Sequence, residues 1–294
     1  MTPARGTRAR GASDSSARDG TPGAPVEVPA PEPLPADALD SHCHLDLIER
    51  PADEVIAAAQ AAGIRRMITV GVDLPSSRWS AEFAATCEDV YAAVAIHPNE
   101  TASAAASPAG RDDVLAEISV LAALPQVRAI GETGLDYYRD HASPEIQQDW
   151  FRAHIAIAKQ AGKALMIHDR DAHDDVLRIL DEEGPPDKVI FHCFSGDAAM
   201  AKRCAEAGYV MSFAGNLTFK NAQPLRDAAA AAPADLILVE TDAPFLTPVP
   251  HRGKPNSPAM AADTLRCLAG VKQIDTARLC ALVTATGERV FGPW

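Results

Sequence analysis

From residue 38 onward, the chain alternates between short apolar runs and longer, Ala-rich amphipathic segments, and this alternation restricts its possible folds most. The apolar runs have the length of β-strands, and the segments between them have the length of helices. Eight strands are expected, at residues 38–42, 64–72, 90–96, 127–132, 164–168, 188–193, 209–213 and 236–241. Helices are expected at 51–62, 76–87, 112–124, 144–161, 171–183, 197–207, 221–231, 257–270 and 276–291.

Eight strands separated by helices favour an α/β fold of the (β/α)8 TIM-barrel type over a doubly wound open sheet, the second possibility. Four of the expected helices stop at a glycine, which suits the residue after a helix end. These glycines are Gly63, Gly162, Gly184 and Gly208. A barrel commonly has about 250 residues. Residues 38–294 therefore suffice for one barrel domain, and no second domain is required.

Residues 1–37 are rich in Pro, Ala, Gly, Ser, Thr and Arg and have almost no large apolar side chains. Such a segment cannot offset the entropy lost on ordering, so a disordered N-terminal tail is expected. Arg5, Arg8 and Arg10 are not followed by an apolar segment, which argues against an export signal. A basic arm that touches nucleic acid is the alternative interpretation of these arginines.

Two further observations concern location. No apolar run reaches about 18 residues, so no membrane span is expected. The six cysteines form no C-x-x-C pair, which favours free thiols in a reducing compartment. We therefore expect a cytoplasmic protein.

Histidines and carboxylates stand at or just after the ends of the expected strands. His42 and His44 are two residues apart, so a strand directs both imidazoles to one side. The ends of the fourth, fifth, sixth and eighth strands carry Glu132, His168, His192 and Asp242. A TIM barrel gathers the C-terminal ends of its strands at one mouth, where active sites lie. This set predicts a centre for one or two divalent cations, because imidazole suits zinc-like metals and carboxylate also admits magnesium or manganese.

Other side chains near these positions have weaker signals. His97 follows the third strand and is expected to contact substrate. Cys43 and Cys193 adjoin predicted ligands, but strand alternation points them to the opposite face, where buried, unreactive thiols are expected. The remaining histidines in loops and helices are expected to be structural or solvated: His141, His154 and His173.

The formal net charge of −13 disfavours long-range attraction to nucleic acid. A polyanionic substrate would have to be held locally, by cations at the mouth. Arg170, two residues after His168, and Arg252 are the expected phosphate contacts, and ordinary loop salt bridges are their alternative role. Glu240 is expected to face the same pocket and to support a metal ligand without binding the metal itself.

The segments DSHCHLD, AIHPNE, AIGETGLDYYRD, MIHDRDA, IFHCFSG, SFAGNLTFKNA and VETDAPFLTPVPHRGKPNSP resemble, in order, the signatures of the TatD family of metal-dependent hydrolases and deoxyribonucleases. The resemblance implies a TIM barrel of the amidohydrolase superfamily. It also implies two divalent metal ions, Mg, Zn or Mn. One would be held by His42, His44 and Asp242 and the other by His168 and His192, with Glu132 as the bridge.

Family members hydrolyse DNA, often as 3′ to 5′ exonucleases that prefer single strands. The resemblance therefore implies DNA as the substrate, with Asp242 and Glu132 in the catalytic machinery and Asp242 as general base. Neither a membrane nor an obligate protein partner is expected. Two alternatives remain open from the residues alone. One is an amidohydrolase acting on a small cyclic amide or ester, and the other is a non-catalytic binding or quality-control protein.

Overall fold

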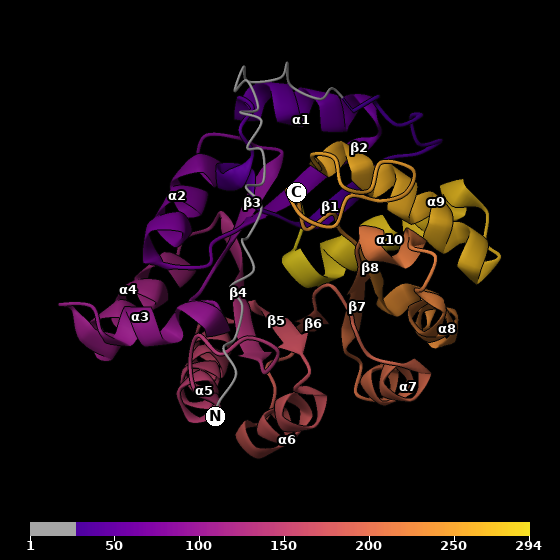
Figure 1. Cartoon of the computed structure of the whole chain (residues 1–294). Helices are drawn as coiled ribbons and strands as arrows, with labels where there is room; N and C mark the ends of the chain where they lie inside the picture. Colours follow the sequence, from indigo (N-terminus) through magenta and orange to yellow (C-terminus); the bar gives the residue numbers. More distant parts are fainter. Residues whose placement is uncertain (1–27) are drawn as a thin grey trace, which may run out of the picture.

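Eight parallel strands form the centre of the computed structural model, which describes residues 28–294 (Figure 1). They are β1 (Ala38–Cys43), β2 (Ile64–Val70), β3 (Val90–Val94), β4 (Val127–Asp136), β5 (Ala164–Arg170), β6 (Val189–Phe191), β7 (Val210–Phe213) and β8 (Ile237–Val239). Each strand pairs with the next one in sequence, and a bridge between Cys43 and Ala243 brings the first and last together. The predicted TIM barrel is confirmed, and the doubly wound sheet is wrong.

Helices surround this sheet in Figure 1. They are α1 (Ala52–Ala61), α2 (Leu74–Ala84), α3 (Thr101–Ala105), α4 (Gly110–Ala122), α5 (Pro144–Ala161), α6 (His173–Glu183), α7 (Ala198–Glu206), α8 (Gln223–Ala231), α9 (Ala261–Lys272) and α10 (Thr276–Phe291). Short 3-10 helices span Leu45–Leu47, Pro98–Glu100, Gly215–Thr218, Ala234–Leu236 and Pro258–Met260. The short helix α3 was not expected. The glycines expected to end helices all have positive φ: Gly63, Gly162, Gly184 and Gly208.

The core consists mainly of aliphatic side chains from the strands and from the inner faces of the helices. Small residues let neighbouring strands and helices approach closely, and Gly134 shows this near the mouth. A Cβ atom on Gly134 would lie 2.1 Å from the backbone oxygen of His168. Only glycine therefore lets β4 run this close to the end of β5.

Strand β4 is longer than expected, so the predicted position of Glu132 at the end of this strand is wrong. The expected strand ended at Glu132, but β4 continues to Asp136 because its pairing with β5 extends as far as Arg170. The register of this pairing shifts between Ile130 and Thr133, which is the signature of a bulge or similar irregularity. Glu132 therefore lies inside the strand, within the irregular stretch.

The segment before β1 is packed against the barrel, so a tail that is disordered up to residue 37 is wrong for residues 28–37. Leu34 is buried, and its backbone N–H donates to the oxygen of Ala62 at 2.9 Å. The Arg266 guanidinium donates to the backbone oxygen of Pro33 at 3.1 Å. The rest of the expected tail, residues 1–27 with the arginines of the possible basic arm, lies outside the described residues.

Two further findings bear on the predictions of location. Within residues 28–294, no helix is both long enough and apolar enough to cross a membrane. All six cysteines are free thiols.

Candidate metal centre

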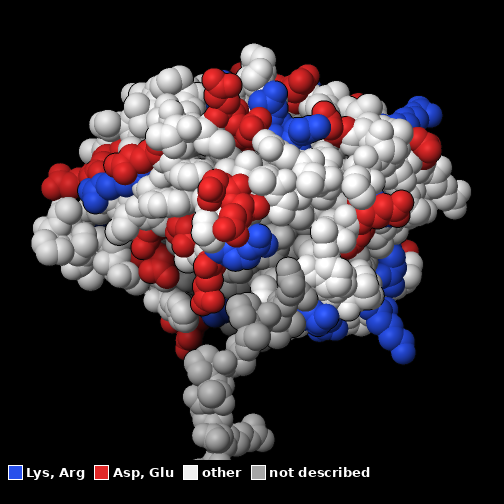
Figure 2. All heavy atoms as spheres, turned by 90° about the horizontal axis from the view of Figure 1, so that it is seen from above, with Lys and Arg blue, Asp and Glu red and all other residues white. Residues whose placement is uncertain are grey.

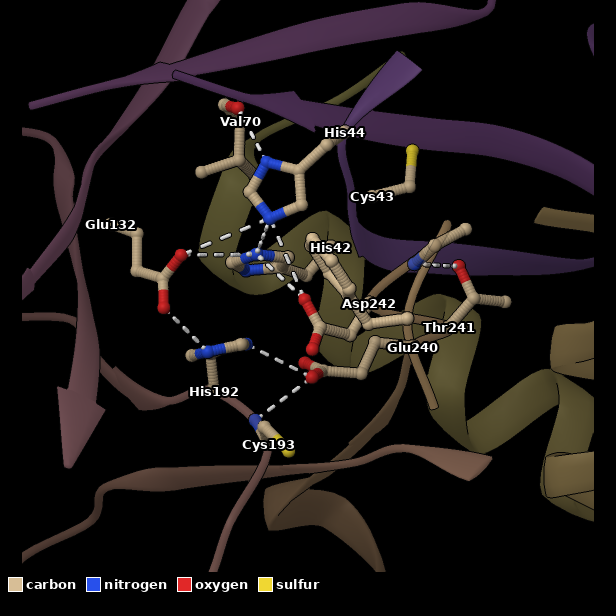
Figure 3. A network of polar contacts seen from close by, with 12 residues as sticks. His42, Cys43, His44, Val70, Glu132, His192, Cys193, Glu240, Thr241 and Asp242 are labelled. Carbon is tan, nitrogen blue, oxygen red and sulfur yellow. Dashed lines mark hydrogen bonds and ion pairs between the residues drawn. The ribbon is translucent and has the colours of Figure 1, made fainter. Parts of the chain in front are cut away.

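Predicted ligands from β1 and from the loop after β8 meet at the mouth of the barrel (Figure 3). The Nε2 atoms of His42 and His44 lie 3.2 Å apart. The Oδ1 atom of Asp242 is 3.7 Å from Nε2 of His42 and 3.5 Å from Nε2 of His44. Both imidazoles are buried. Three donor atoms thus face one another at the spacing that a shared cation needs.

Glu132 lies between two groups of imidazoles. Its Oε1 atom is 2.6 Å from Nδ1 of His168 and 2.8 Å from Nε2 of His192. Its Oε2 atom is on the other side, 3.5 Å from Nε2 of His42 and 3.9 Å from Nε2 of His44. Each oxygen of one carboxylate therefore faces a different pair of histidines. This is the geometry expected of a ligand that bridges two cations.

Hydrogen bonds behind the cluster fix the tautomers of two histidines. Nδ1 of His44 lies 2.9 Å from the carbonyl oxygen of Val70, which can only accept. Nδ1 of His192 lies 3.0 Å from Oε1 of Glu240, in the supporting position expected for that carboxylate. Both Nδ1 atoms therefore carry protons in the neutral imidazoles, and the Nε2 lone pairs face the cluster. Metal-binding histidines commonly have such a partner.

The charges of the cluster favour ionised Glu132. Burial opposes ionisation of its carboxyl group, but charge interactions with His192 and His97, together with hydrogen bonds to His168 and His192, hold its pKa well below the usual range. Burial also opposes the charged form of His42. It therefore lowers the pKa of His42, which keeps that imidazole neutral. Neutral imidazole and ionised carboxylate are the forms that bind metals.

Strand β1 holds Asp242 in place. The backbone N–H of Asp242 donates to the oxygen of His42 at 2.9 Å, and His44 N–H donates to the oxygen of Ala243 at 2.8 Å. Asp242 has a φ of 53°, which is uncommon outside glycine. Backbone strain of this kind persists where surrounding contacts fix the chain, commonly at functional sites.

Comparison with known protein families identifies the family of this chain. Residues 39–292 match the profile described as TatD related DNase. The chain belongs to the TatD family. It is 44% identical over 263 residues to a Mycobacterium tuberculosis protein described as uncharacterised metal-dependent hydrolase TatD, covering 86% of this chain and 97% of that one. Metal-dependent hydrolase YabD of Bacillus subtilis, also uncharacterised, is 37% identical over 256 residues, with coverages of 86% and 98%.

Solved structures agree with this assignment. The YJJV TatD homologue of Escherichia coli superposes with a TM-score of 0.81 at 26% identity, covering 87% of this chain and 98% of that one. A TatD family hydrolase of Entamoeba histolytica shares the fold, with a TM-score of 0.75, 18% identity and coverages of 88% and 99%. This TatD-family protein is therefore a member of a metal-dependent hydrolase family.

His97 lies beside the second group of donors in this TatD-family protein. Its Nδ1 atom accepts the backbone N–H of Asn99 at 3.0 Å, so the proton of the neutral ring is on Nε2. That Nε2 atom is 3.5 Å from Oε1 of Glu132. Burial lowers the pKa of His97 and favours this neutral form. His97 thus presents a donor to Glu132, at the site where the sequence analysis expected a substrate contact.

Asp136, at the end of β4, lines the mouth and was not among the predicted site residues. Its Oδ2 atom is 3.2 Å from Nε2 of His168 and accepts from the Asn99 side chain at 3.1 Å. Burial lowers the pKa of His168, but hydrogen bonds to Asp136 and Glu132 outweigh this effect and raise it to about 9. Asp136 lies an even number of residues after Glu132, so a strand continued beyond Glu132 would have identified it.

A second missed residue, Asp40, lies behind the first group of ligands. It is fully buried and accepts hydrogen bonds from the hydroxyl and the backbone N–H of Thr241 at 2.5 and 2.9 Å. It also accepts the backbone N–H of His42 at 3.2 Å. Burial nevertheless raises the pKa of Asp40 to about 8. The only signal in the sequence was a carboxylate placed inside an expected buried strand.

The two cysteines beside ligands have different surroundings. Cys43 is buried and its thiol contacts the oxygen of Ile68, as expected. Cys193 lines the cavity, with Sγ 3.8 Å from Nδ2 of Asn216, so its predicted position on the opposite face is wrong. Strand β6 ends at Phe191, and Cys193 has a φ of 42°. The alternation of strand faces therefore does not extend to this residue.

The other histidines occupy three kinds of position. His154 is buried, with Nδ1 at 2.8 Å from the hydroxyl of Thr133. His173 is partly exposed and pairs with Asp169 at 2.8 Å. His141 is exposed but also lines the cavity of the metal centre. His154 and His173 thus have the structural roles expected of them, and His141 borders the mouth.

The cavity over the ligands has a volume of about 620 Å³. Arg170 lines it, and its guanidinium stacks on Tyr138 with 3.9 Å between Cζ and the ring centroid. Arg139 lines it too, a cation that sequence analysis did not select. Arg252 is exposed, stacks on Phe219 at 4.2 Å and is not among the residues that line this cavity. Of the two expected phosphate contacts, only Arg170 thus lines this cavity.

Proposed function

We propose that this TatD-family hydrolase is a deoxyribonuclease that cleaves phosphodiester bonds of DNA, as a 3′ to 5′ exonuclease that prefers single strands. The observation that carries the proposal is the position of Glu132, whose two oxygens face two separate groups of donors. Two divalent cations about 4 Å apart are the common device for displacement at phosphorus. The polarity and the strand preference follow the family resemblance.

The donor atoms fit two cations of the Mg, Mn or Zn class. His42, His44 and Asp242 would hold one, and His168 and His192 would hold the other, with Glu132 shared between them. Mixed nitrogen and oxygen donors admit all three metals. When bound, divalent cations lower the pKa of water and stabilise negative charge on phosphoryl oxygens.

Asp242 is the residue that we assign as general base. Its side chain is 16% exposed, against 5% for Glu132, so it is the more accessible of the two carboxylates to water in the cavity. Burial opposes ionisation of Asp242, but its hydrogen bond with His44 and its charge interactions with His192 and His42 lower its pKa. An ionised carboxylate at the edge of the cluster can accept a proton from the attacking water and return it to the leaving oxygen.

Local cations compensate for the acidic surface. Figure 2 shows larger groups of Asp and Glu than of Lys and Arg on the visible face, in keeping with the net charge of −13. Arg170 and Arg139 line the cavity, where a guanidinium can bind phosphate through two parallel hydrogen bonds. The buried ligands are reached from the barrel mouth. A flexible single strand can bend into it more easily than a stiff duplex.

Hydrolysis of end-labelled DNA tests the proposal. Protein reconstituted separately with Mg²⁺, Mn²⁺ or Zn²⁺ should shorten a 5′-labelled single strand one nucleotide at a time, and chelation should stop the reaction. Phosphorothioate linkages at the 3′ end should block shortening, whereas the same linkages at the 5′ end should not. A matching duplex should be cut more slowly. A Glu132→Gln protein, purified in parallel, controls for contaminating nucleases.

The same preparations should be offered a cyclic amide, a lactone and a small phosphodiester. Metal-loaded protein that opens the cyclic amide or lactone efficiently, but leaves DNA and the small phosphodiester intact, contradicts the proposal in favour of the small-molecule amidohydrolase. Absence of any hydrolysis with every metal would favour the non-catalytic alternative.

A further inference from the structure

An exposed aromatic side chain stands directly beside the metal centre. Phe245 lies three residues after Asp242, is 52% exposed and lines the cavity. Its ring centroid is 6.1 Å from that of His44, with an angle of 70° between the ring planes. Leu47, 46% exposed, lines the same cavity. Apolar surface is therefore exposed to water next to one group of predicted ligands.

The backbone that carries Phe245 is fixed on both sides. Its N–H donates to the oxygen of Asp242 at 2.8 Å, and its carbonyl accepts from the side chain of Asn256, which also donates to Thr241 at 3.1 Å. The next residue, Leu246, places its oxygen 2.0 Å from the position of a Cβ on Gly215, so only glycine fits there. Phe245 is thus presented on a well-anchored loop, and the site need not order it when a ligand binds.

The opposite rim of the mouth carries a cation. Because β1 is next to β8 in the closed ring, the ends of β4 and β5 lie across the mouth from the loop that carries Phe245. Arg170, the last residue of β5, is held over the ring of Tyr138, and it lines the cavity. The ligand cluster therefore lies between an aromatic rim and a cationic rim.

We propose that Phe245 is a stacking platform for one base of the DNA substrate, adjacent to the phosphodiester that is cleaved. This inference rests on the proposed deoxyribonuclease function. A nucleotide alternates a flat apolar base with a charged phosphate. The base stacks on Phe245, its phosphate faces the ligand cluster, and a neighbouring phosphate faces Arg170. A phenyl ring offers no strong hydrogen-bonding group, so the platform accepts every base. Proteins that bind single strands without sequence preference use aromatic side chains in the same way.

Abasic substrates combined with Phe245 variants test this inference. A set of single strands carries one tetrahydrofuran abasic residue, moved over the three positions nearest each end. Phe245→Leu keeps an apolar side chain but removes the aromatic face, and Phe245→Tyr keeps that face. Val120→Ala is the matched control, because Val120 is 67% exposed on α4 and is not among the cavity-lining residues.

For the wild type, we expect one position at which loss of the base raises KM about tenfold, a difference of about 1.4 kcal/mol. Phe245→Leu should raise KM for the intact strand by a similar factor. In this variant, an abasic residue at that position should cause no further increase in KM. Stacking is made equally in the ground and transition states, so kcat should stay within about twofold. Phe245→Tyr should restore the wild-type KM, and Val120→Ala should not change it. Metal content should be equal in all four proteins.

Three results would overturn the inference, and they are distinguishable. If the wild type cleaves DNA while Phe245→Leu keeps the wild-type KM or the same abasic penalty, the platform is wrong and the deoxyribonuclease stands. If the wild type leaves every strand intact with each metal, the proposed function fails and the inference fails with it. A parallel loss of kcat and metal content in Phe245→Leu would assign the residue to the architecture of the centre and also overturn the inference.

Discussion

The hydroxyl of Thr241 donates to Oδ2 of Asp40 at 2.5 Å and ties the segment after β8 to β1. Each of these residues lies close in sequence to a predicted ligand: Asp40 is two residues before His42, and Thr241 directly precedes Asp242. Asp40 is fully buried, so the hydrogen bonds that it accepts offset part of the free-energy cost of removing it from water. One buried contact thus supports the alignment of two elements that contribute to the first group of donors.

Thr241→Val removes this donor with little change in side-chain volume. The buried carboxyl group of Asp40 loses a hydrogen-bond partner, so we expect a loss of about 2 kcal/mol in the free energy of unfolding and weaker metal binding. Thr86→Val is the control, because the Thr86 hydroxyl is exposed and bonds only to the nearby backbone of Phe83. Denaturant unfolding and metal titration measure both effects. Equal stability of the two variants would contradict the role of the Asp40–Thr241 contact.

Glu132→Gln tests the bridge. The amide keeps the shape of the side chain but removes the charge shared by both donor groups, so metal content and turnover should fall, with turnover reduced about 100-fold or more. Far-UV circular dichroism should hardly change, because the outer helices do not depend on this charge. Glu117→Gln, which breaks an exposed pair with Arg78, should leave metal content unaltered. Unchanged stoichiometry in Glu132→Gln would refute the assignment.

Arg170 and Arg252 should differ in their effect on charged substrates. Arg170 lines the cavity and Arg252 does not, so Arg170→Ala should lower kcat/KM for single-stranded DNA at least tenfold, about 1.4 kcal/mol. Arg252→Ala should have a smaller effect. The loss for Arg170→Ala should grow at low salt, where ionic contacts are least screened. Initial rates across a salt series measure this, and equal losses in the two variants would contradict the placement.

His154 makes stability depend on acid. Ile96 N–H donates to Nε2 of His154, so the neutral ring donates from Nδ1 to Thr133. Burial, with the charge of Arg111, lowers its pKa to about 3. Below the usual pKa of 6.5, the unfolded chain gains a proton that folded His154 does not. This group should therefore remove up to about 1.4 kcal/mol of stability per pH unit as pH falls from 6.5 towards 3.

The prediction is checked by unfolding metal-free protein across this pH range and comparing wild type with His154→Gln, which should lose this part of the slope. His173→Gln should leave the slope over this range unchanged. Its hydrogen bond to Asp169 raises the pKa of His173 above 6.5, so the stabilisation from its protonation is complete below pH 6.5 and is lost only as pH rises through the raised pKa. Identical slopes for wild type and His154→Gln would show that His154 does not titrate as described.

The segment before β1 should contribute measurably to stability. Leu34 is buried against the end of α1, so Leu34→Ala should cost about 2 kcal/mol. A chain that begins at Val28 should melt at a higher temperature than one that begins at Asp37. Pro35→Ala, at an exposed position nearby, is the control. Equal melting temperatures for the two shortened chains would show that the packing of this segment is negligible.

The sequence by itself determined the barrel and the composition of its mouth. Strands that are buried on both faces appear as apolar runs, and helices between them have their own period, so local pattern was sufficient for the order of elements. His42, His44, His168, His192 and Asp242 could be grouped because every strand of a parallel barrel ends at the same mouth. No knowledge of a contact was needed for that step.

Tertiary structure alone decided the features that depend on partners distant in sequence. Pairing with β5 keeps β4 extended beyond Glu132 and brings Asp136 to His168. The early end of β6 turns Cys193 into the cavity. Phe245 and Arg170 line one cavity only because the ring closes. A period in the sequence reports which residues of one segment share a face. Strand register, strand length and the pairs of residues that lie across the barrel mouth depend on interaction energies between segments, which no local pattern contains.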